Sequence, residues 1–384
     1  MDPAVAAAVV LVGLTAAPYV AFLALYVAVR PSGSPVDPVP PEPGAAPTVS
    51  VVLPTYNEAD IVERKLHELC ELDYPDDRLE VVVADDSDDD TAAVVRSFFA
   101  DRAAPAFVLR ERKERTGVAA AVNEAVAAAS GDVVFRTDAD ATLADDVLRR
   151  AVAVLADPDV AAVTGRQAEV LGGSAVEAEY RSALARVQAL ESALDSTFIV
   201  HGPCVAFERA AFEPIDPDSL ADDTEIAVRI RRAGHRVVMD PTLRFGESGV
   251  SGFAARRGRK DRRAMGLVRL LVRHRDALGR YGRYGRIVLP FNWWFLVVSP
   301  WALLLDVGVV TAALVAVAGP VGLAAPLALV GLGALGSRDA LGPLQAVWAL
   351  VDAQASLLLA QVRLVLRGGD GTWEPDRESR EVFE

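Results

Sequence analysis

Long apolar stretches and one polar region divide the chain. Residues 4–29 contain no charged side chain, residues 287–337 contain one, and residues 341–366 contain two. About 20 consecutive apolar residues are enough to cross a bilayer. The pattern therefore predicts a membrane protein with one large aqueous region between its first two apolar stretches.

The aqueous region alternates between two kinds of run. Short, continuously apolar runs are typical of strands buried on both faces, and longer amphipathic or Ala-rich runs are typical of helices. This alternation predicts an α/β fold with a mostly parallel sheet covered by helices on both faces. The expected strands are residues 49–54, 79–85, 106–112, 132–138 and 160–166, and the expected helices are residues 59–72, 91–100, 118–129 and 144–155.

Changes in composition predict the segment boundaries. A Pro- and Gly-rich stretch with no apolar period predicts an extended linker. In the last apolar stretch polar residues recur at helical spacing, which favours an interfacial helix over a crossing one. We expect a transmembrane helix over residues 1–30, the linker over 31–47, the α/β domain over 48–250, amphipathic interfacial helices over 251–286, two transmembrane helices over 287–337, an interfacial or transmembrane helix over 338–367, and a polar tail over 368–384.

Charges beside the first apolar stretch predict its orientation. Asp2 precedes it and Arg30 follows it, so the positive-inside rule places the aqueous region in the cytoplasm. A cleaved signal peptide is disfavoured, because the apolar run is too long and has no basic leader. Cys70 and Cys204 fit this compartment as reduced thiols outside any disulfide framework.

The charge balance is strongly acidic. The net charge is −14, and Lys65, Lys113 and Lys260 are the only lysines among 39 basic residues. Such surfaces resemble those of proteins from salt-accumulating halophilic archaea, in which salt screens the repulsion between carboxylates. Most acidic residues are therefore interpreted as solvated surface, and the balance argues against a nucleic-acid partner.

Polar residues follow three of the expected strands. The sequence PTYNE (residues 54–58) ends the first, Asp85 and Asp86 end the second, and Asp138 and Asp140 end another. In parallel sheets, ligands bind beyond the carboxyl ends of the strands. Two carboxylates this close suit a hard cation, Mg²⁺ or Mn²⁺, which in turn would hold a diphosphate. The alternative is a pair of solvated acids in a loop.

Five segments, in order, resemble motifs of a known enzyme family. They are VSVVLPTYNE, VVVADDSDDDT, TDADAT, VHGPCVAFERAAFE and LADDTEIAVRIRRAGHRVVMDP. Over about residues 48–270 the chain resembles family 2 glycosyltransferases. The resemblance implies a GT-A fold and an inverting transfer of a sugar from a nucleotide sugar.

The resemblance also implies roles for residues on the donor side. Pro54, Tyr56 and Glu58 would shape the nucleoside pocket, and Asp85, with Asp86 beside it, would accept a hydrogen bond from the base. For Asp86 a role in the turn before the next helix remains the alternative. Asp138 would lie over the ribose and the metal, and Asp140 would be the direct metal ligand.

On the acceptor side, the family's Thr-Glu-Asp motif reads Ala221-Asp222-Asp223. Only its last acid is kept, and Asp223 would be the catalytic base. Gly202 and Asp222 would contact the acceptor. Because the two acids also open an expected helix, capping is the alternative for one of them.

Two departures from the family pattern involve basic residues. Val118 stands where the family often has a lysine, and Arg115 could supply that charge. The segment RGRKDRRAMG corresponds to the Gln-any-any-Arg-Trp motif of processive members, with Arg259 for Gln, Arg262 kept and Arg263 for Trp. Arg259 and Arg262 could bind the leaving diphosphate bidentately. Alternatively, residues 253–286 form a basic helix that contacts anionic lipid heads.

Together these features predict a membrane glycosyltransferase. It would move a sugar from a UDP- or GDP-sugar to a membrane-held acceptor: a polyprenyl phosphate, a lipid-linked oligosaccharide or a glycolipid. A processive polysaccharide synthase is one alternative, which the missing tryptophan and the few crossings disfavour. A non-catalytic membrane scaffold that binds nucleotide sugars is the other.

Overall fold

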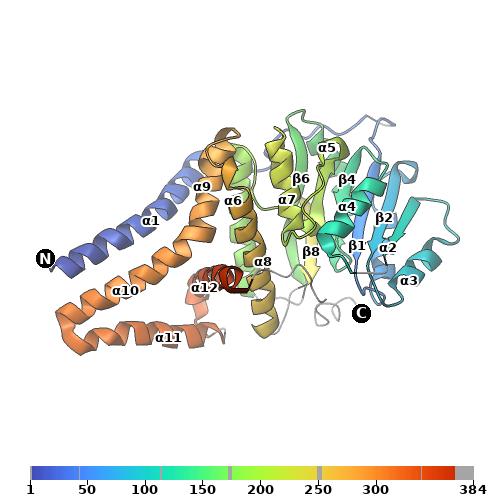
Figure 1. Ribbon diagram of the computed structural model, residues 1–384. Coiled ribbons are helices and arrows are strands. Elements are labelled where there is room, and N and C mark those ends of the chain that lie inside the picture. Colours follow the sequence, from blue (N-terminus) through green and yellow to red (C-terminus); the bar gives the residue numbers. More distant parts are fainter. Residues whose placement is uncertain are drawn as a thin grey trace. The chain divides into compact units, whose positions relative to one another are not determined.

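The computed structural model describes residues 2–42, 44–112, 115–171, 175–248, 253–338 and 340–367. The chain forms two compact units, and both are drawn in Figure 1. We call them the sheet unit, within residues 31–255 and 276–288, and the helical unit, within residues 2–30, 256–275 and 289–367.

One mixed sheet of eight strands organises the described part of the sheet unit (Figure 1). The strand order is β3-β2-β1-β4-β7-β6-β8-β5. The first four strands of this order are mutually parallel, as are β6 and β8, whereas β7 and β5 pair antiparallel with their neighbours. The bounds are β1 Val49–Thr55, β2 Leu79–Asp85, β3 Ala106–Glu111, β4 Val133–Arg136, β5 Ala141–Leu143, β6 Val160–Leu171, β7 Val205–Glu208 and β8 Arg236–Ser248. The predicted α/β fold with a mostly parallel sheet is confirmed.

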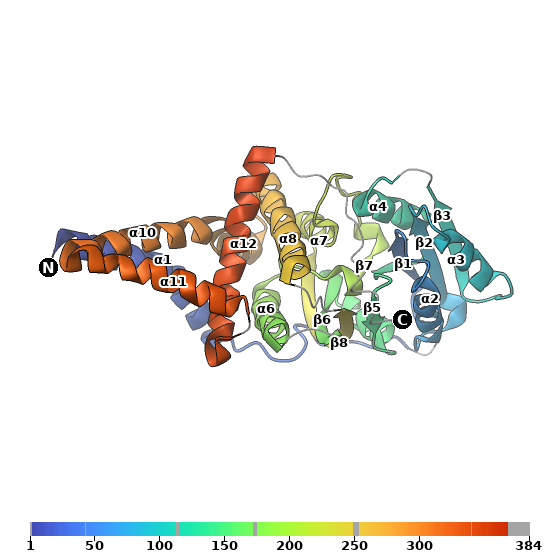
Figure 2. The same cartoon turned by 90° about the horizontal axis from the view of Figure 1, so that it is seen from below.

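Helices cover both faces of the sheet (Figure 2). On one face lie α2 (Val62–Glu71), α3 (Thr91–Phe99) and α5 (Val147–Leu155), and on the other lie α4 (Val118–Ala128) and α7 (Asp222–Arg232). Another helix, α6 (Ala175–Leu194), contacts β6 and β8. Neighbouring residues of β1 show why the strands are apolar throughout, since Val51 and Leu53 pack in one core and Val52 in the other. A strand buried on both faces loses the usual alternation of polar and apolar residues.

Two helices begin later than the sequence pattern predicts. Helix α2 begins at Val62 and α5 at Val147, three residues later than expected in each case. For α5 the reason is tertiary, because the backbone N–H of Ala144 donates to the carbonyl of Arg244 in β8 (3.1 Å). Residue 144 therefore continues the β5–β8 pairing instead of starting the helix.

The Pro-rich linker is held against the sheet unit by side chains. The guanidinium of Arg78 donates to the carbonyl oxygens of Gly44 (2.9 Å) and Ala46 (2.5 Å). The hydroxyl of Tyr74 donates to the carbonyl of Pro47 (2.5 Å). Because Pro-rich backbone has few donors of its own, these side-chain donors give the linker an ordered path.

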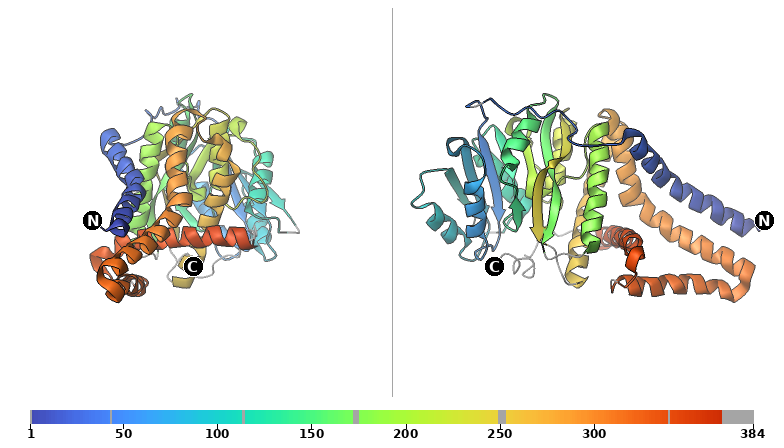
Figure 3. Two further views of the ribbon diagram at one scale, coloured as in Figure 1. Left: turned by 60° about the vertical axis from the view of Figure 1, so that its left-hand side comes forward. Right: turned by 180° about the vertical axis from the view of Figure 1, so that it is seen from behind.

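The helical unit consists of apolar helices and one basic helix. Among the residues that the structure describes, three segments, 3–29, 284–336 and 348–366, are long and apolar enough to cross a membrane. Helices α10 and α11 form a hairpin around a short 3₁₀ turn, as Figure 3 shows. The bounds are α1 Pro3–Val29, α8 Phe253–Arg273, α9 Leu289–Trp293, α10 Ser299–Ala318, α11 Ala324–Gly336 and α12 Gln345–Arg367.

Ion pairs join α8 to α12. Asp352 of α12 accepts hydrogen bonds from Arg257 (2.7 Å) and Lys260 (2.8 Å) of α8. In the opposite sense, Arg363 of α12 donates to Asp261 of α8 (2.7 Å). Both aspartates are buried. The charged residues of the predicted polar stripe on α12 therefore pair with α8.

Replacing Arg78 tests how the linker is held. In Arg78→Ala the carbonyls of Gly44 and Ala46 lose their donor, so we expect faster amide exchange across residues 36–48. Hydrogen–deuterium exchange followed by mass spectrometry measures this directly. Arg102→Ala, which removes a guanidinium that lies over the Phe98 ring, is the matched control. Equal exchange in both variants would contradict the assignment.

Candidate functional site

The strand register brings three predicted strand ends to one edge of the sheet. Thr55 of β1 pairs with Asp85 of β2. On the other side of β1, Val52 pairs with Arg136 of β4. Asp138, two residues beyond Arg136, therefore follows β4 at about the level where β1 ends. The acids that follow β2 and β4 flank the end of β1, as the sequence pattern predicts.

At the end of β2, Asp85 is held by hydroxyl groups. Its Oδ1 accepts hydrogen bonds from Thr55 Oγ1 (2.7 Å) and Ser87 Oγ (2.5 Å). Asp85 is 2% exposed, and this burial raises the pKa of its carboxyl group, although the two hydroxyl donors oppose the shift. The carboxylate is thus fixed in orientation at the sheet edge.

Asp86 ties a neighbouring loop to the same edge. Its Oδ2 accepts hydrogen bonds from both the backbone N–H and the hydroxyl of Thr116 (3.0 Å each). The preceding residue, Arg115, places its guanidinium carbon 4.0 Å from the ring centroid of Tyr56. Such a cation–π contact contributes about 0.5–1 kcal/mol at an exposed site. Three predicted donor-side residues therefore lie together.

The alternative role of helix capping belongs to a different acid. Asp89 Oδ1 accepts hydrogen bonds from the backbone N–H (2.9 Å) and the hydroxyl (2.5 Å) of Thr91. Glu58 lies beside this turn, because its backbone N–H donates to Thr91 Oγ1 (2.9 Å). Pro54 lies one residue before the end of β1. Asp86 therefore contacts the loop of Thr116, whereas Asp89 holds the start of α3.

Arg136 forms ion pairs with an acid that follows β4 and with one that begins α7. Its Nη1 and Nη2 lie 3.1 and 3.0 Å from the two carboxylate oxygens of Asp138. The same Nη2 lies 3.3 Å from Asp222 Oδ2. Burial alone would lower the pKa of Arg136, but the nearby carboxylates of Asp138, Asp222 and Asp223 outweigh it and raise the pKa. The guanidinium thus stays charged among the acids.

Asp223 is oriented by backbone donors. Its Oδ2 accepts a hydrogen bond from the backbone N–H of Gly202 (2.9 Å), and its Oδ1 accepts one from Thr224 (2.6 Å). The residue before α7 is Ala221, which has no capping side chain. Asp223 therefore serves partly to satisfy the first turn of α7, while Asp222 pairs with Arg136.

Helix α2 fixes the backbone that carries Asp138 and Asp140. Arg64 Nη2 donates to the carbonyl of residue 139 (2.9 Å), and Lys65 Nζ donates to that of residue 141 (3.1 Å). Glu68, paired with Lys65 at 2.6 Å, accepts the N–H of residue 143 (2.9 Å). The residues bound in this way (139, 141 and 143) are buried, whereas Asp138, Asp140 and Thr142, which alternate with them, are partly exposed.

Four of these supporting residues were not identified from the sequence: Arg136, Arg64, Lys65 and Glu68. Two signals were present. Arg136 is a charge in an otherwise apolar run, and Lys65 is one of three lysines in an Arg-rich chain. The structure adds that Lys65 is 0% exposed. Burial lowers the pKa of Lys65, although the carboxylate of Glu68 opposes this effect.

The oxygen ligands that could hold a metal are Asp138 and Asp140. Within the described ranges, no group of three or more His, Cys, Asp or Glu residues has a geometry that could hold a metal ion. A site completed by substrate needs less, since Mg²⁺ in such sites is held by one or two carboxylates together with phosphate oxygens. The donor set therefore fits a divalent ion that arrives with a diphosphate.

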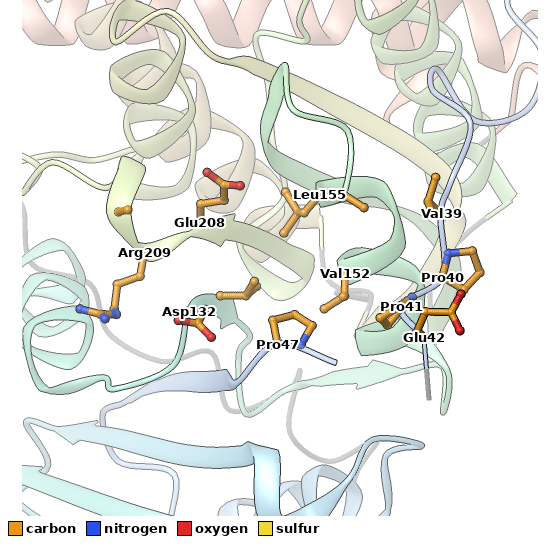
Figure 4. A pocket seen from close by; sticks show the side chains of 13 residues that line it. Val39, Pro40, Pro41, Glu42, Pro47, Asp132, Val152, Leu155, Glu208 and Arg209 are labelled. Atoms are coloured by element: carbon orange, nitrogen blue, oxygen red, sulfur yellow. The ribbon is translucent and has the colours of Figure 1, made fainter. Parts of the chain in front are cut away.

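Two predicted residues belong to the helical unit, and one cavity of the sheet unit lies away from this cluster. Arg259 and Arg262 belong to α8 of the helical unit, and their contact with a diphosphate stays a prediction. A cavity of 640 Å³ lies at the other end of the strands, between the linker and α5 (Figure 4). Asp132, Glu208 and Arg209 line it, and none of the predicted site residues does.

Removing the buried lysine tests the support beneath the metal motif. Lys65→Met leaves the carboxylate of Glu68 without its cation, so we expect the unfolding free energy to fall by about 3 kcal/mol. The double variant Lys65→Met/Glu68→Gln keeps an acceptor for residue 143 and should lose less than the single one. Scanning calorimetry compares the melting temperatures. A double variant that is less stable than Lys65→Met would contradict the pairing.

Burial of Asp222 predicts a pH dependence of stability. Burial, reinforced by Asp223 and Asp138 and opposed by Arg136, raises the pKa of Asp222 from 3.8 to about 6. Stability linked to this group is therefore present near pH 4 and lost as the pH rises to 6, by at most about 3 kcal/mol.

We expect the melting temperature in EDTA to fall less over this range in Asp222→Asn, which cannot ionise, than in the wild type. Calorimetric scans at half-unit pH steps measure the difference. Parallel curves for the two proteins would contradict the shift.

Comparison with a solved structure extends over nearly the whole chain. A mannosyltransferase from Pyrobaculum calidifontis, in complex with GDP-Man and Mn²⁺, is similar with a TM-score of 0.76 and 30% sequence identity. The likeness covers 95% of this chain and 99% of that one. It therefore includes the apolar helices as well as the sheet.

Two curated relatives match over shorter ranges. An N-acetylglucosaminyltransferase of Rhizobium meliloti is 28% identical over 261 residues, 63% of this chain and 60% of that protein. A beta-monoglucosyldiacylglycerol synthase of Synechocystis sp. is 34% identical over 153 residues, 40% of this chain and 30% of that protein. The chain thus spans less than two thirds of the length of either relative.

The family itself follows from the profile match and from the full-length likeness. Residues 50–216 match the profile of Glycosyl transferase family 2. This range includes β1, β2 and β4 with the acids that follow them. The fold is GT-A, and the chain belongs to glycosyltransferase family 2.

Proposed function

We propose that the protein transfers a sugar from a UDP- or GDP-sugar, with inversion, to an acceptor held in the membrane. The full-length likeness to a mannosyltransferase in complex with GDP-Man supports this most strongly. GDP-mannose is therefore the first donor to test. A polyprenyl phosphate, a lipid-linked oligosaccharide and a glycolipid are the candidate acceptors. The name of the Synechocystis relative, a beta-monoglucosyldiacylglycerol synthase, supports a membrane lipid as the acceptor class.

In this proposal the ends of β1 and β2 bind the nucleoside. Asp85 and Asp86 accept hydrogen bonds from the base, and the stacked pair of Tyr56 and Arg115 lies against the nucleotide. Pro54 and Glu58, beside the same strand end, shape the pocket. Arg115 also supplies a positive charge for the diphosphate, because Val118 has replaced the lysine often found in the family.

The acids after β4 serve the leaving group. A divalent cation, Mg²⁺ or Mn²⁺, held by Asp140 with Asp138 beside it, would stabilise the negative charge that develops on the departing diphosphate. The contacts of Arg64 and Lys65 with the backbone of residues 139 and 141 keep both aspartates in place. Arg259 and Arg262 stay candidates for the diphosphate on sequence grounds alone.

Asp223 is the proposed general base. Both of its carboxylate oxygens accept backbone hydrogen bonds, so its orientation is fixed before the acceptor arrives. It takes the proton of an acceptor hydroxyl as the new glycosidic bond forms on the face opposite the leaving diphosphate, which inverts the configuration. An ionised lipid phosphate has no such proton, and Asp223 then contributes less.

The helical unit would hold the protein at the membrane where the acceptor resides. Large apolar side chains of α1, α10 and α11 are exposed in the unit, as expected for contact with lipid. The flanking charges Asp2 and Arg30 place the sheet unit in the cytoplasm. Among the exposed side chains are Val9, Leu14, Leu23, Leu304, Val317, Leu327 and Val330.

Helix α12 would lie at the membrane surface. Its partner α8 has eight cations among 21 residues, which would be costly to place in hydrocarbon. Because Asp352 and Arg363 pair with α8, α12 stays beside it. The length and composition of α12 also allow it to cross the membrane, so its placement at the surface is part of the proposal.

A processive synthase is the second candidate, supported by the name of a relative in Staphylococcus epidermidis, a poly-beta-1,6-N-acetyl-D-glucosamine synthase. Against it, Arg263 stands where processive members have a tryptophan. An aromatic ring at this position would stack on a sugar of the growing chain. The length of the product on a gel distinguishes single addition from polymerisation.

Turnover of GDP-mannose by purified protein in vesicles tests the proposal. With Mn²⁺ and a polyprenyl phosphate or glycolipid in the bilayer, the wild type should transfer mannose to lipid. Asp140→Ala should lower turnover at least about 100-fold, because the leaving diphosphate loses its stabilising charge. Asp223→Asn should lower transfer to a hydroxyl acceptor about 100-fold as well. Radiolabelled donor and lipid extraction give both rates.

Asp145→Asn, an exposed acid before α5, is the matched control and should keep full activity. Unchanged turnover in Asp140→Ala would remove the metal from the proposal. If the wild type neither hydrolyses nor transfers the nucleotide sugar, the non-catalytic scaffold replaces the enzyme as the proposed function.

A further inference from the structure

Arg136 is the last residue of β4 and a charge in an otherwise apolar strand. It is 5% exposed, so its guanidinium is almost entirely removed from water. A buried charge is costly unless it is paired and hydrogen-bonded. Its partners are carboxylates of the candidate site, which indicates that the site accounts for its presence in the strand.

The partners of Arg136 come from two segments that are far apart in the sequence. One is Asp138 of the metal motif, bound through Nη1 and Nη2 of the guanidinium at 3.1 and 3.0 Å. The other is Asp222 in the first turn of α7, 3.3 Å from Nη2. One side chain therefore spans the donor-side acids and the acceptor-side acids.

Gly202 is fitted against the same guanidinium. A Cβ built on Gly202 would overlap Nη1 of Arg136 and lie 2.5 Å from its Cζ, closer than real Cβ atoms approach other atoms. The backbone N–H of this glycine donates to Asp223 (2.9 Å). Successive contacts therefore connect the metal motif to the proposed base: Asp138 pairs with Arg136, Arg136 packs against Gly202, and Gly202 donates to Asp223.

We propose that Arg136 is a positioning residue that joins the metal motif to the acceptor-side acids, and that residue 202 must be glycine to leave room for it. Without the guanidinium, Asp138 and Asp222 repel each other. The backbone of residue 202 also loses its packing contact with the guanidinium. The base Asp223 then loses its fixed orientation. The role rests on the function proposed above, because it acts through that base.

A purely structural role would affect folding alone, and two measurements separate the possibilities. The first is a cycle of melting temperatures in EDTA with Arg136→Ala, Gly202→Ala and their combination. We expect Gly202→Ala to lower the melting temperature in the wild type by several degrees, because its methyl group meets the guanidinium. In the Arg136→Ala background the same change should have little effect.

Arg231→Ala is the matched control for this cycle. Arg231 is another buried arginine of the sheet unit, paired with Asp195 at 2.9 Å and with the carbonyl of Tyr281. Arg231→Ala should also lower the melting temperature. In the double variant with Gly202→Ala, the decrease should equal the sum of the decreases in the two single variants. A cycle that is additive for Arg136 as well would overturn the proposed contact.

The second measurement is kcat and the donor KM at a temperature well below every melting transition. Arg136→Ala and Gly202→Ala should each lower kcat about 100-fold, as expected when reacting groups are displaced by about 1 Å. The donor KM should change much less than kcat, because Asp85 and Asp86 remain in place and only Asp138 loses its partner. The double variant should resemble the single ones.

Arg136→Lys keeps the charge but cannot span both acids with one ammonium group. It should restore part of the lost kcat, giving about a 10-fold deficit relative to the wild type. Arg136→Ala with kcat within two-fold of the wild type would overturn the positioning role. An inactive wild type would instead contradict the proposed function, and the melting cycle would still decide the contact between Arg136 and Gly202.

Discussion

The candidate site depends on one buried cation among several carboxylates. Asp138, Asp222 and Asp223 each raise the pKa of Arg136, and in a medium of low dielectric the mutual repulsion of these carboxylates would be large without the guanidinium. A guanidinium suits this place because its fork can pair with one carboxylate through two nitrogens and still reach another. Gly202 completes the arrangement, since a larger residue there would displace the fork.

Around this centre, the sheet supplies position and the helices supply restraint. The parallel strands β1 and β2 end at the same level, and Asp138, two residues beyond the end of β4, lies about level with them, so the residues that follow the three strands come close together. Helix α2 then holds the backbone beside Asp140 through Arg64 and Lys65. These contacts are made to the backbone and not to the carboxylate of Asp140, the proposed metal ligand, which suits a site that is completed by its substrate.

The helical unit solves a different physical problem. A nucleotide sugar is soluble in water, whereas the proposed acceptors stay in the bilayer, so an enzyme that joins them would work at the boundary. Apolar helices can anchor it there, and the basic α8 can remain at the surface. Asp261 and Asp352 neutralise part of the charge of α8, and these ion pairs account for Asp352 and Arg363 in the largely apolar α12.

The sequence by itself determined the alternation of strands and helices, the apolar helices and the acids at the strand ends, because periodicity and strand-end chemistry are local properties. It did not reveal that Arg136 pairs with Asp222, that Lys65 lies beneath the metal motif, or that Ala144 belongs to a strand pairing. These contacts join residues far apart in the chain. Only the tertiary structure decided them, since a buried charge receives its partner from whichever segment the fold brings beside it.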